Sequence, residues 1–361
     1  MQPDERQFYA RHFSLAEVGE AGQQRLKQSR VLVIGAGGLG CPALQYLTAA
    51  GVGQLTICDG DHVELSNLHR QPLYRSDDVS KWKATCAAAR CLEQNPWIRV
   101  DAVTTWVTPE NIQVLVRAHD LVLDCTDNLA TNMLIHDACY LGHIPLIAAA
   151  IHRFEGIIHR YTFASERQAC ARCLCAGIAE PTSVGSCTER GVIGALAGVF
   201  GSIQAEIALH HILKIETLPH ATSWIMDLRT MQARLIGWSQ RKDCALCAAR
   251  KPPSLAVLHP NEPNVIISSL DATDTKARLI DIRETEERVT TPFPPPLASE
   301  HRPLSTWKST QLLKHQSYIL LCAKGKRSEY LAKKLRQEGY TQVFSLKGGI
   351  DTLAVTQALK V

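Results

Sequence analysis

The sequence predicts an α/β protein that begins with a Rossmann-like, doubly wound, mostly parallel sheet and ends with a smaller α/β domain. Three observations predict this architecture. A β-branched run over 31–34 leads into a glycine-rich turn, strand-like and helix-like segments alternate through residue 165, and the alternation resumes after a proline-containing stretch. The length of 361 residues also exceeds that of a typical single domain. We therefore expect a first domain over 1–249, a linker over 250–263 and a second domain over 264–361.

The first elements are an amphipathic helix ending near Lys27 and the strand over 31–34. Arg11 lies ahead of them, and its residue type alone indicates a solvated surface charge. The strand enters a turn in which Gly35, Gly37 and Gly40 have the spacing G-x-G-x-x-G, with Gly38 as a further glycine between them. Glycine lets the backbone approach a phosphate, whose charge then meets the N–H groups at the start of the next helix.

A second strand, over 54–59, ends in Asp59, whose carboxylate can accept hydrogen bonds from ribose hydroxyls. The turn and Asp59 together predict a nucleotide site. On these features alone, an NAD-dependent oxidoreductase is an alternative. The following loop adds polar side chains where open α/β sheets bind their ligands, namely Asp61, Asn67, Arg70 and Gln71.

Lys81 and Lys83 open the next helix, which is predicted to run to about Gln94. A cation at a helix amino terminus opposes the helix dipole, so an anionic partner can explain its presence, as can simple surface exposure. A further strand ends in Asp124 and is followed by Asp127. Asp127 suits either the cap of a helix running to Tyr140 or a ligand of Mg²⁺, and capping is the commoner role.

Strands are expected over 145–150 and 156–163, and two C-x-x-C pairs follow them: Cys170 with Cys173, and Cys244 with Cys247. Four thiolates in this spacing match a tetrahedral zinc clamp. A redox C-x-x-C is the alternative, but that motif normally starts a helix, and we expect neither pair to do so. Four protein ligands leave no open position, so this zinc would hold the fold.

Cys187 lies between the two pairs, in a polar loop flanked by glycine. Exposure in this loop and the nearby Arg190 are compatible with a nucleophilic thiol, but on these features alone an inert cysteine is the commoner case. The apolar stretch over 191–213 is interrupted by Gln204, Glu206 and two histidines at helical spacing, which predicts a buried helix and not a membrane span.

Composition narrows the function classes further. The net charge of +4 gives no support to nucleic-acid binding. The amino terminus lacks the apolar core of a signal peptide, and the thirteen cysteines are an odd number spread through predicted elements. We therefore expect a cytoplasmic protein with reduced thiols, without a disulfide framework and without a membrane segment.

The second domain is predicted to contain strands over 279–283, 318–322 and 343–346, a helix over 327–338 and a closing helix after Gly348 and Gly349. Cys322 stands at the end of a buried strand, before a short glycine-containing loop and a helix. Backbone N–H groups would then surround the sulfur, and Lys324, Lys326 and Arg327 add positive charge. This surrounding favours a thiolate or persulfide on Cys322.

Residues 5–250 resemble the MoeB/ThiF adenylyltransferases, relatives of ubiquitin-activating enzymes, and residues 264–361 resemble a rhodanese domain. The combination is similar to MoeZ-type proteins. The resemblance rests on residues 35–40, 59–71 and 124–128, Lys83, Phe154-Glu-Gly156, both C-x-x-C pairs and residues 185–201. It implies an ATP site with Mg²⁺ in which Asp59 holds the ribose. Asn67, Arg70 and Lys83 address the phosphates, Asp127 sits at the metal, and Arg11 reaches the ATP of a second subunit in a homodimer.

The same resemblance implies the substrate, which is the terminal glycine carboxylate of a small ubiquitin-like sulfur-carrier protein ending in Gly-Gly. ATP converts it to an acyl adenylate. A persulfide on Cys322, loaded by an upstream persulfide donor, then attacks the acyl carbon, and Cys187 helps release the thiocarboxylate. Arg190 and the proline-rich stretch between Arg283 and Trp307 depart from the family pattern. A non-catalytic rhodanese-like scaffold domain is therefore an alternative.

Overall fold

A computed structural model describes residues 2–163, 168–176, 191–216, 218–259, 265–270, 277–293, 299–307 and 312–352. The chain forms two compact units, Met1–Pro260 and Asn261–Val361. The expected linker over 250–263 is not wholly free, because α11 (Leu255–Leu258) lies within it and Leu255 is buried in a cluster of the first unit. The two units are described separately below.

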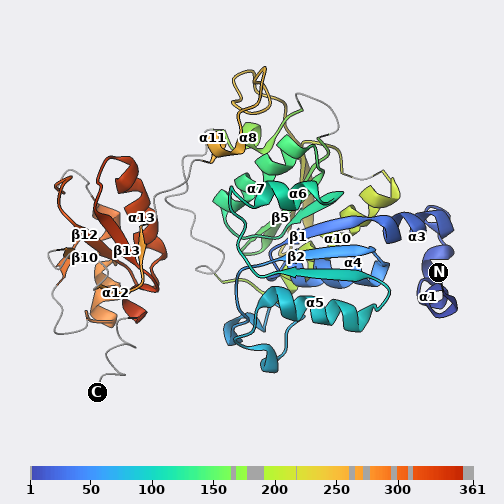
Figure 1. The fold of residues 1–361 in the computed structure, drawn as a ribbon, viewed down its shortest axis with the longest axis horizontal. Coiled ribbons are helices and arrows are strands. Elements are labelled where there is room, and N and C mark those ends of the chain that lie inside the picture. The colour runs from blue at the N-terminus through green and yellow to red at the C-terminus, as the bar shows by residue number, and fades with distance from the viewer. Residues whose placement is uncertain are drawn as a thin grey trace. The chain divides into compact units, whose positions relative to one another are not determined.

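The first unit is built on an eight-stranded sheet of order β3-β2-β1-β4-β5-β6-β7-β8. Figure 1 shows β1, β2 and β5 of this sheet among the helices of the unit. The first five strands in this order pair in parallel, and the last four pair antiparallel. The sheet is therefore mostly parallel with an antiparallel extension. The strands are β1 (Arg30–Ile34), β2 (Gln54–Cys58), β3 (Arg99–Val103), β4 (Leu121–Asp124), β5 (Leu146–His152), β6 (Glu155–Tyr161), β7 (Thr222–Asp227) and β8 (Gln232–Gly237).

Helices cover both faces of this sheet because successive side chains of a strand point to opposite faces. Val31 and Val33 of β1 belong to the apolar cluster of α4, α5 and α10, whereas Leu32 and Ile34 belong to the cluster of α6 and α7. The helices are α1 (Pro3–Phe8), α2 (Ala10–Phe13), α3 (Gly19–Gln28), α4 (Gly40–Ala50), α5 (Lys83–Gln94), α6 (Ile112–Arg117), α7 (Leu129–Gly142), α8 (Ala171–Leu174) and α10 (Gly194–Leu213). The doubly wound prediction is confirmed.

The long apolar helix α10 packs inside this unit. Its length and composition alone would allow it to cross a membrane, and half of its most apolar window is buried. The buried side includes Phe200 and Gln204, and Gly201 lies against the backbone of Leu39 at the start of α4. The prediction of a buried helix is confirmed for the side that faces α4 and the sheet.

The second unit holds a five-stranded sheet of order β11-β10-β12-β13-β9, in which every pairing is parallel. Its strands are β9 (Ile266–Ile267), β10 (Arg278–Asp281), β11 (Glu300–His301), β12 (Tyr318–Leu321) and β13 (Val343–Leu346), and its helices are α12 (Thr285–Thr290) and α13 (Lys326–Gln337). Residues 349–352 begin the expected closing helix, and the rest of it lies outside the described residues.

Candidate functional site

The glycine turn lies between β1 and α4, and two of its glycines are required by the fold. Gly35 has a φ of +91°, and a Cβ there would lie 2.8 Å from the Cys125 carbonyl oxygen. A Cβ on Gly40 would lie 2.0 Å from the Gly35 carbonyl oxygen. At Gly37 the nearest such neighbour is the Gln71 Nε2 atom at 3.7 Å, so this position leaves room for a ligand. A Cβ on Gly38 would lie 3.1 Å from the Cβ of Ala197 in α10.

Asp59 follows β2 and connects the second strand to the turn. One carboxylate oxygen accepts the Ala36 N–H at 2.7 Å, and the other accepts the Asp61 N–H at 2.9 Å. Burial raises the pKa of Asp59, and these backbone bonds partly offset the effect. In the protein without ligand, Asp59 therefore fixes the glycine turn, and each of its oxygens keeps lone-pair capacity for another donor.

Lys83 is the first residue of α5, and its side chain is 7% exposed. Its ammonium group lies 2.6 Å from the Asp61 carboxylate, whose side chain is 42% exposed. The expected anionic partner of a lysine at this helix start is therefore Asp61. A buried cation paired with an exposed anion can exchange that anion for a phosphate at small cost, because Asp61 regains water when it is released.

Asn67 is the last residue of the short 3₁₀ turn η1 (Leu65–Asn67), and Arg70 lies in the loop that follows it. Arg70 Nη1 donates to the Ser66 carbonyl oxygen at 2.8 Å, and buried Asn67 accepts the Glu64 N–H at 3.3 Å. The start of α10 supports this loop, because a Cβ on Gly194 would lie 2.4 Å from the His69 carbonyl oxygen. Gln71 is also buried, and its Oε1 atom has no hydrogen-bond partner among the described residues.

The strand β4 ends in Asp124, which is fully buried and accepts from Thr126 and Asn132. The capping interpretation of Asp127 is wrong, because Asn128 is the N-cap of α7 and its side chain accepts the Thr131 N–H at 2.8 Å. Asp127 is exposed and makes no hydrogen bond within the described part of the chain. Its carboxylate is therefore open to a metal ion or a ligand.

Two predicted site residues are not joined to this arrangement. Arg11 is exposed on α2, with no ion pair to another described residue. Cys187, together with Arg190, lies outside the described residues. The remaining predicted nucleotide residues lie on the glycine turn, directly after β2, on η1 and its loop, or at the starts of α4, α5 and α7.

The two C-x-x-C pairs come together, as predicted, into one buried cluster. The sulfur atoms of Cys170, Cys173, Cys244 and Cys247 all lie within 4.8 Å of one another. Tetrahedral zinc with Zn–S bonds of about 2.3 Å needs sulfur separations near 3.8 Å, and Cys170 and Cys244 lie 3.6 Å apart. Burial and neighbouring thiolates raise the pKa of Cys170, which a bound divalent cation would reverse. One expectation is wrong, since α8 begins directly after Cys170.

A buried carboxylate that the sequence did not reveal connects this cluster to α7. Asp137 accepts from Arg172, which lies between Cys170 and Cys173, and from His259, which follows α11. His136 contacts the second oxygen of Asp137 at 2.9 Å and the Ala171 N–H with its other nitrogen. Burial alone would raise the pKa of Asp137, but the hydrogen bonds from His136, His259 and Arg172 hold this pKa well below its usual range.

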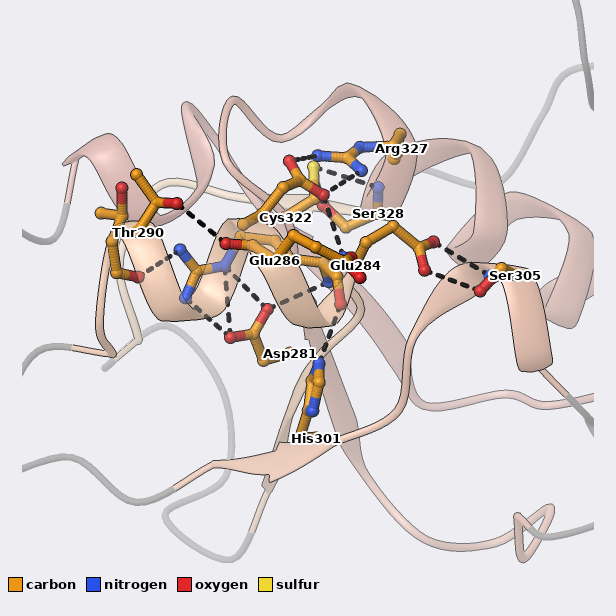
Figure 2. A network of polar contacts seen from close by, with 12 residues as sticks. Asp281, Glu284, Glu286, Thr290, His301, Ser305, Cys322, Arg327 and Ser328 are labelled. Carbon is orange, nitrogen blue, oxygen red and sulfur yellow. Dashed lines mark hydrogen bonds and ion pairs between the residues drawn. The ribbon is translucent and has the colours of Figure 1, made fainter.

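Cys322 follows β12 in the second unit, with the residue 1% exposed. Ser328 of α13 lies beside this sulfur (Figure 2). Its backbone N–H is 3.5 Å from the sulfur and its hydroxyl is 3.4 Å from it. The loop closes tightly, because a Cβ on Gly349 would lie 2.2 Å from the Cys322 carbonyl oxygen. Of the backbone donors predicted around the sulfur, the N–H of Ser328 is the one found among the described residues, and the second donor is the side chain of the same residue.

The predicted ring of positive charge needs a correction. Arg327 forms a double hydrogen bond with Glu287 of α12, with Arg327 Nη1 at 2.7 Å from Oε2 (Figure 2). This pairing neutralises the guanidinium and lowers the pKa of Glu287. Lys324 and Lys326 are exposed to solvent. Another arginine of this unit, the fully buried Arg283, is paired with Asp281. It also donates to the Thr291 carbonyl oxygen at the end of α12.

Two family models match this chain. The model described as "ThiF family" matches residues 9–247, and the model described as "Rhodanese-like domain" matches residues 267–354. The first covers the glycine turn and the four-cysteine cluster, and the second covers Cys322.

Three curated relatives are similar to more than half of this chain. A "Sulfur carrier protein adenylyltransferase" of Thermus thermophilus is 45% identical over 57% of this chain and 78% of its own length. A "SAMP-activating enzyme E1" of Haloferax volcanii is 40% identical over 66% of this chain and 87% of its own. An "Adenylyltransferase and sulfurtransferase MOCS3" of Drosophila virilis is 36% identical over 78% of this chain and 61% of its own.

Solved structures support the fold alone, because their sequence identities are low. A crystal structure of E. coli MccB with ATP has a TM-score of 0.56 at 19% identity, covering 67% of this chain and 75% of MccB. A crystal structure of selenomethionine PaaA has a TM-score of 0.57 at 24% identity, covering 67% of this chain and 76% of PaaA.

Proposed function

Because this chain belongs to the ThiF family and carries a rhodanese-like domain, we propose that it activates and then thiolates the terminal glycine of a small ubiquitin-like sulfur-carrier protein. One observation carries this proposal. A glycine turn near a buried lysine cation and a strand-end cysteine that accepts from a buried backbone N–H and a buried hydroxyl occur in a single chain. The chain is thus an adenylyltransferase and a sulfurtransferase, which the ThiF match favours over an NAD-dependent oxidoreductase.

The first step makes the carrier carboxylate reactive. A carboxylate oxygen attacks the α-phosphorus of ATP, the bond between the α- and β-phosphates breaks, and pyrophosphate leaves. The residues supply position and charge. Asp59 receives the ribose hydroxyls, and Arg70, Asn67 and Lys83 receive the phosphates, with Lys83 released from Asp61. The exposed Asp127 suits Mg²⁺, which would neutralise phosphate charge when bound.

The second step brings in sulfur. The terminal sulfur of a Cys322 persulfide, loaded by an upstream donor, attacks the acyl carbon, and AMP leaves. This attack joins carrier and enzyme through a disulfide. The Cys187 thiolate can then attack the Cys322 sulfur, which releases the carrier thiocarboxylate and leaves a disulfide between Cys187 and Cys322 for an external thiol to reduce.

Two further parts of the proposal concern assembly. Zinc suits the four-cysteine cluster, where it would hold α8 and the segment after β8 together without an open position for chemistry. A homodimer would place Arg11 at the nucleotide of the partner subunit, and the exposure of this side chain is compatible with that role.

The test separates the two half-reactions. Wild-type protein should exchange radiolabelled pyrophosphate into ATP only with a carrier ending in Gly-Gly. It should also form carrier thiocarboxylate when a persulfide donor is added. Cys322→Ala should keep the exchange and lose the thiocarboxylate. NADH binding without exchange would restore the oxidoreductase alternative.

The scaffold alternative predicts a different result for the same variant. If the second unit only holds partners together, Cys322→Ala should make thiocarboxylate at the wild-type rate with the persulfide donor present. Cys175→Ala is the matched control, because this partly exposed thiol lies next to the four-cysteine cluster and has no assigned role.

A further inference from the structure

Ser328 places its hydroxyl against the reactive sulfur. Ser328 is fully buried, and its hydroxyl lies 3.4 Å from the Cys322 sulfur and 3.0 Å from the Gly325 carbonyl oxygen. Its backbone N–H also points at the sulfur, at 3.5 Å. Because the site is buried, water does not replace either contact. The Ser328 hydroxyl has one proton, which it can donate either to the sulfur or to the Gly325 carbonyl oxygen.

A second buried hydroxyl, that of Ser345, affects which acceptor receives the Ser328 proton. Ser345 of β13 is 1% exposed, and its hydroxyl lies 2.8 Å from that of Ser328 and 3.3 Å from the Gly325 carbonyl oxygen. The two hydroxyls together have two protons to donate. Their possible acceptors are the Gly325 carbonyl oxygen, the Cys322 sulfur and the oxygen of the other hydroxyl. If Ser345 donates to the Gly325 carbonyl or to the Ser328 oxygen, the Ser328 proton is free to point at the sulfur.

We propose that the Ser328 hydroxyl, oriented by Ser345, is the side-chain donor that stabilises the anionic sulfur of Cys322. It turns to the Gly325 carbonyl when the negative charge leaves that sulfur. Ser328 touches the reacting atom and is a catalytic residue, whereas Ser345 is a positioning residue. This inference rests on the proposed sulfur-transfer function and adds the group that balances charge in its loading step.

The loading step shows where this donor acts. The Cys322 thiolate attacks the outer sulfur of the donor persulfide, a new bond to that sulfur forms, and the sulfur–sulfur bond of the donor breaks. The donor leaves as a thiolate and takes the electron pair. The inner sulfur of Cys322 is then neutral, so the Ser328 proton loses its charged acceptor and the Gly325 carbonyl becomes the better one.

The nearby cations do not duplicate this role. Arg327 is committed to Glu287, and Lys324 and Lys326 are exposed, where water screens their charge. A hydrogen bond inside a buried site is screened far less. The hydroxyl is therefore expected to stabilise the anion more than these exposed charges do.

The test measures the anion directly, without ATP or carrier, so it does not depend on adenylation. Full-length reduced protein is treated with iodoacetamide over a range of pH, and modification of the Cys322 peptide is followed by mass spectrometry. Ser328→Ala keeps the backbone N–H and removes only the hydroxyl. We expect alkylation at pH 7 to fall about tenfold and the midpoint of the pH profile to move up, because a hydrogen bond to a charged group is lost.

Ser345→Ala should lower the rate by roughly two- to threefold, a partial loss of the same bond. The double variant should behave like Ser328→Ala, because Ser345 acts through Ser328. Ser305→Ala is the matched control, since this serine bonds to Glu284 in the same unit and should leave the profile unchanged.

A Ser328→Ala profile that coincides with wild type, in a protein whose circular dichroism is native, overturns the proposal. If Ser328→Ala does not fold, Ser345→Ala decides: a slower, shifted profile supports the proposal, and an unchanged one overturns it. Failure of pyrophosphate exchange in wild type would refute the proposed adenylation and leave this test intact.

Discussion

At the scale of single residues, side chains that are close in the sequence differ in burial and in hydrogen bonding. Asp127 and Asn128 are adjacent, yet only Asn128 bonds to the helix that follows them. The same contrast holds for Lys83 and Lys81, since Lys83 is buried against Asp61 while Lys81 is 60% exposed. Burial and hydrogen bonding, and not residue type, therefore separate the structural side chains from those open to a ligand.

This contrast makes Asp127 and Asn128 a matched pair for mutation. Asn128→Ala should lower the free energy of unfolding by about 1 kcal/mol, because the N-cap bond to Thr131 is lost. Asp127→Ala should leave stability within about 0.5 kcal/mol of wild type and lower pyrophosphate exchange at least about tenfold. Urea denaturation and the exchange assay measure the two effects. Undiminished exchange in Asp127→Ala would remove this carboxylate from the site.

His159 predicts an acid sensitivity of the first unit. Burial lowers the pKa of His159 to about 4, whereas the unfolded chain has a histidine pKa near 6.5. As pH falls from about 6.5 to about 4, His159 binds a proton in the unfolded state but not in the folded state. The free energy of unfolding therefore decreases. Between pH 6.5 and 5, wild type should lose about 1–2 kcal/mol more than His159→Gln in urea denaturation. Equal losses in the two proteins would contradict this assignment.

At the scale of elements, helix α10 shows how close packing shapes the nucleotide site. It starts against the Arg70 loop and later lies against the first turn of α4. Its glycines are not equivalent, because a Cβ on Gly201 would lie 2.3 Å from the Leu39 carbonyl oxygen, whereas one on Gly198 would meet nothing within 4 Å. One helix thus carries a glycine that the fold needs and one that it does not.

Alanine at each of these positions should have opposite effects. Gly201→Ala forces α10 away from α4 and should destabilise the first unit by roughly 1–3 kcal/mol. It should also weaken pyrophosphate exchange, since α10 supports the Arg70 loop. Gly198→Ala should stabilise by about 0.5–1 kcal/mol, because alanine loses less backbone entropy in a helix. Thermal denaturation of both variants tests this; equal shifts in one direction would refute the packing argument.

At the scale of the whole molecule, each apolar core lies within one of the two units. Two buried clusters contain only residues of the first unit, and two contain only residues of the second. The four cysteines belong to a cluster of the first unit, shared with α6 and α7. A core confined to one unit gives that unit its own cooperative unfolding.

Calorimetry of the full chain should therefore show two transitions. Removal of metal by a chelator, or Cys244→Ser, should lower the melting temperature of the first unit and leave the second unchanged, because metal binding contributes to the folding of the unit that holds it. Metal analysis should give about one zinc per chain in wild type. A single transition, or folded protein without metal and with an unchanged melting temperature, would contradict this account.

The sequence by itself determined the features that depend on covalent spacing. Residues 31–34 and 318–321 had to form strands, because consecutive apolar residues suit burial on both faces, and Gly35, Asp59 and Cys322 follow directly at strand ends. The pairing of the two C-x-x-C motifs was also predictable, because two such pairs in one chain favour a shared zinc site over redox activity.

Tertiary structure alone decided which distant side chains meet. Ser345 beside Ser328, Glu287 beside Arg327, and His259 on Asp137 join segments that no sequence period relates. The strands β7 and β8 were not predicted, because β8 is exposed along its whole length and lacks an apolar pattern. The physical reason is the distance along the chain over which each effect acts. Secondary-structure propensity and motif spacing act over a few residues, whereas these contacts exist only after the sheet and its helices have packed.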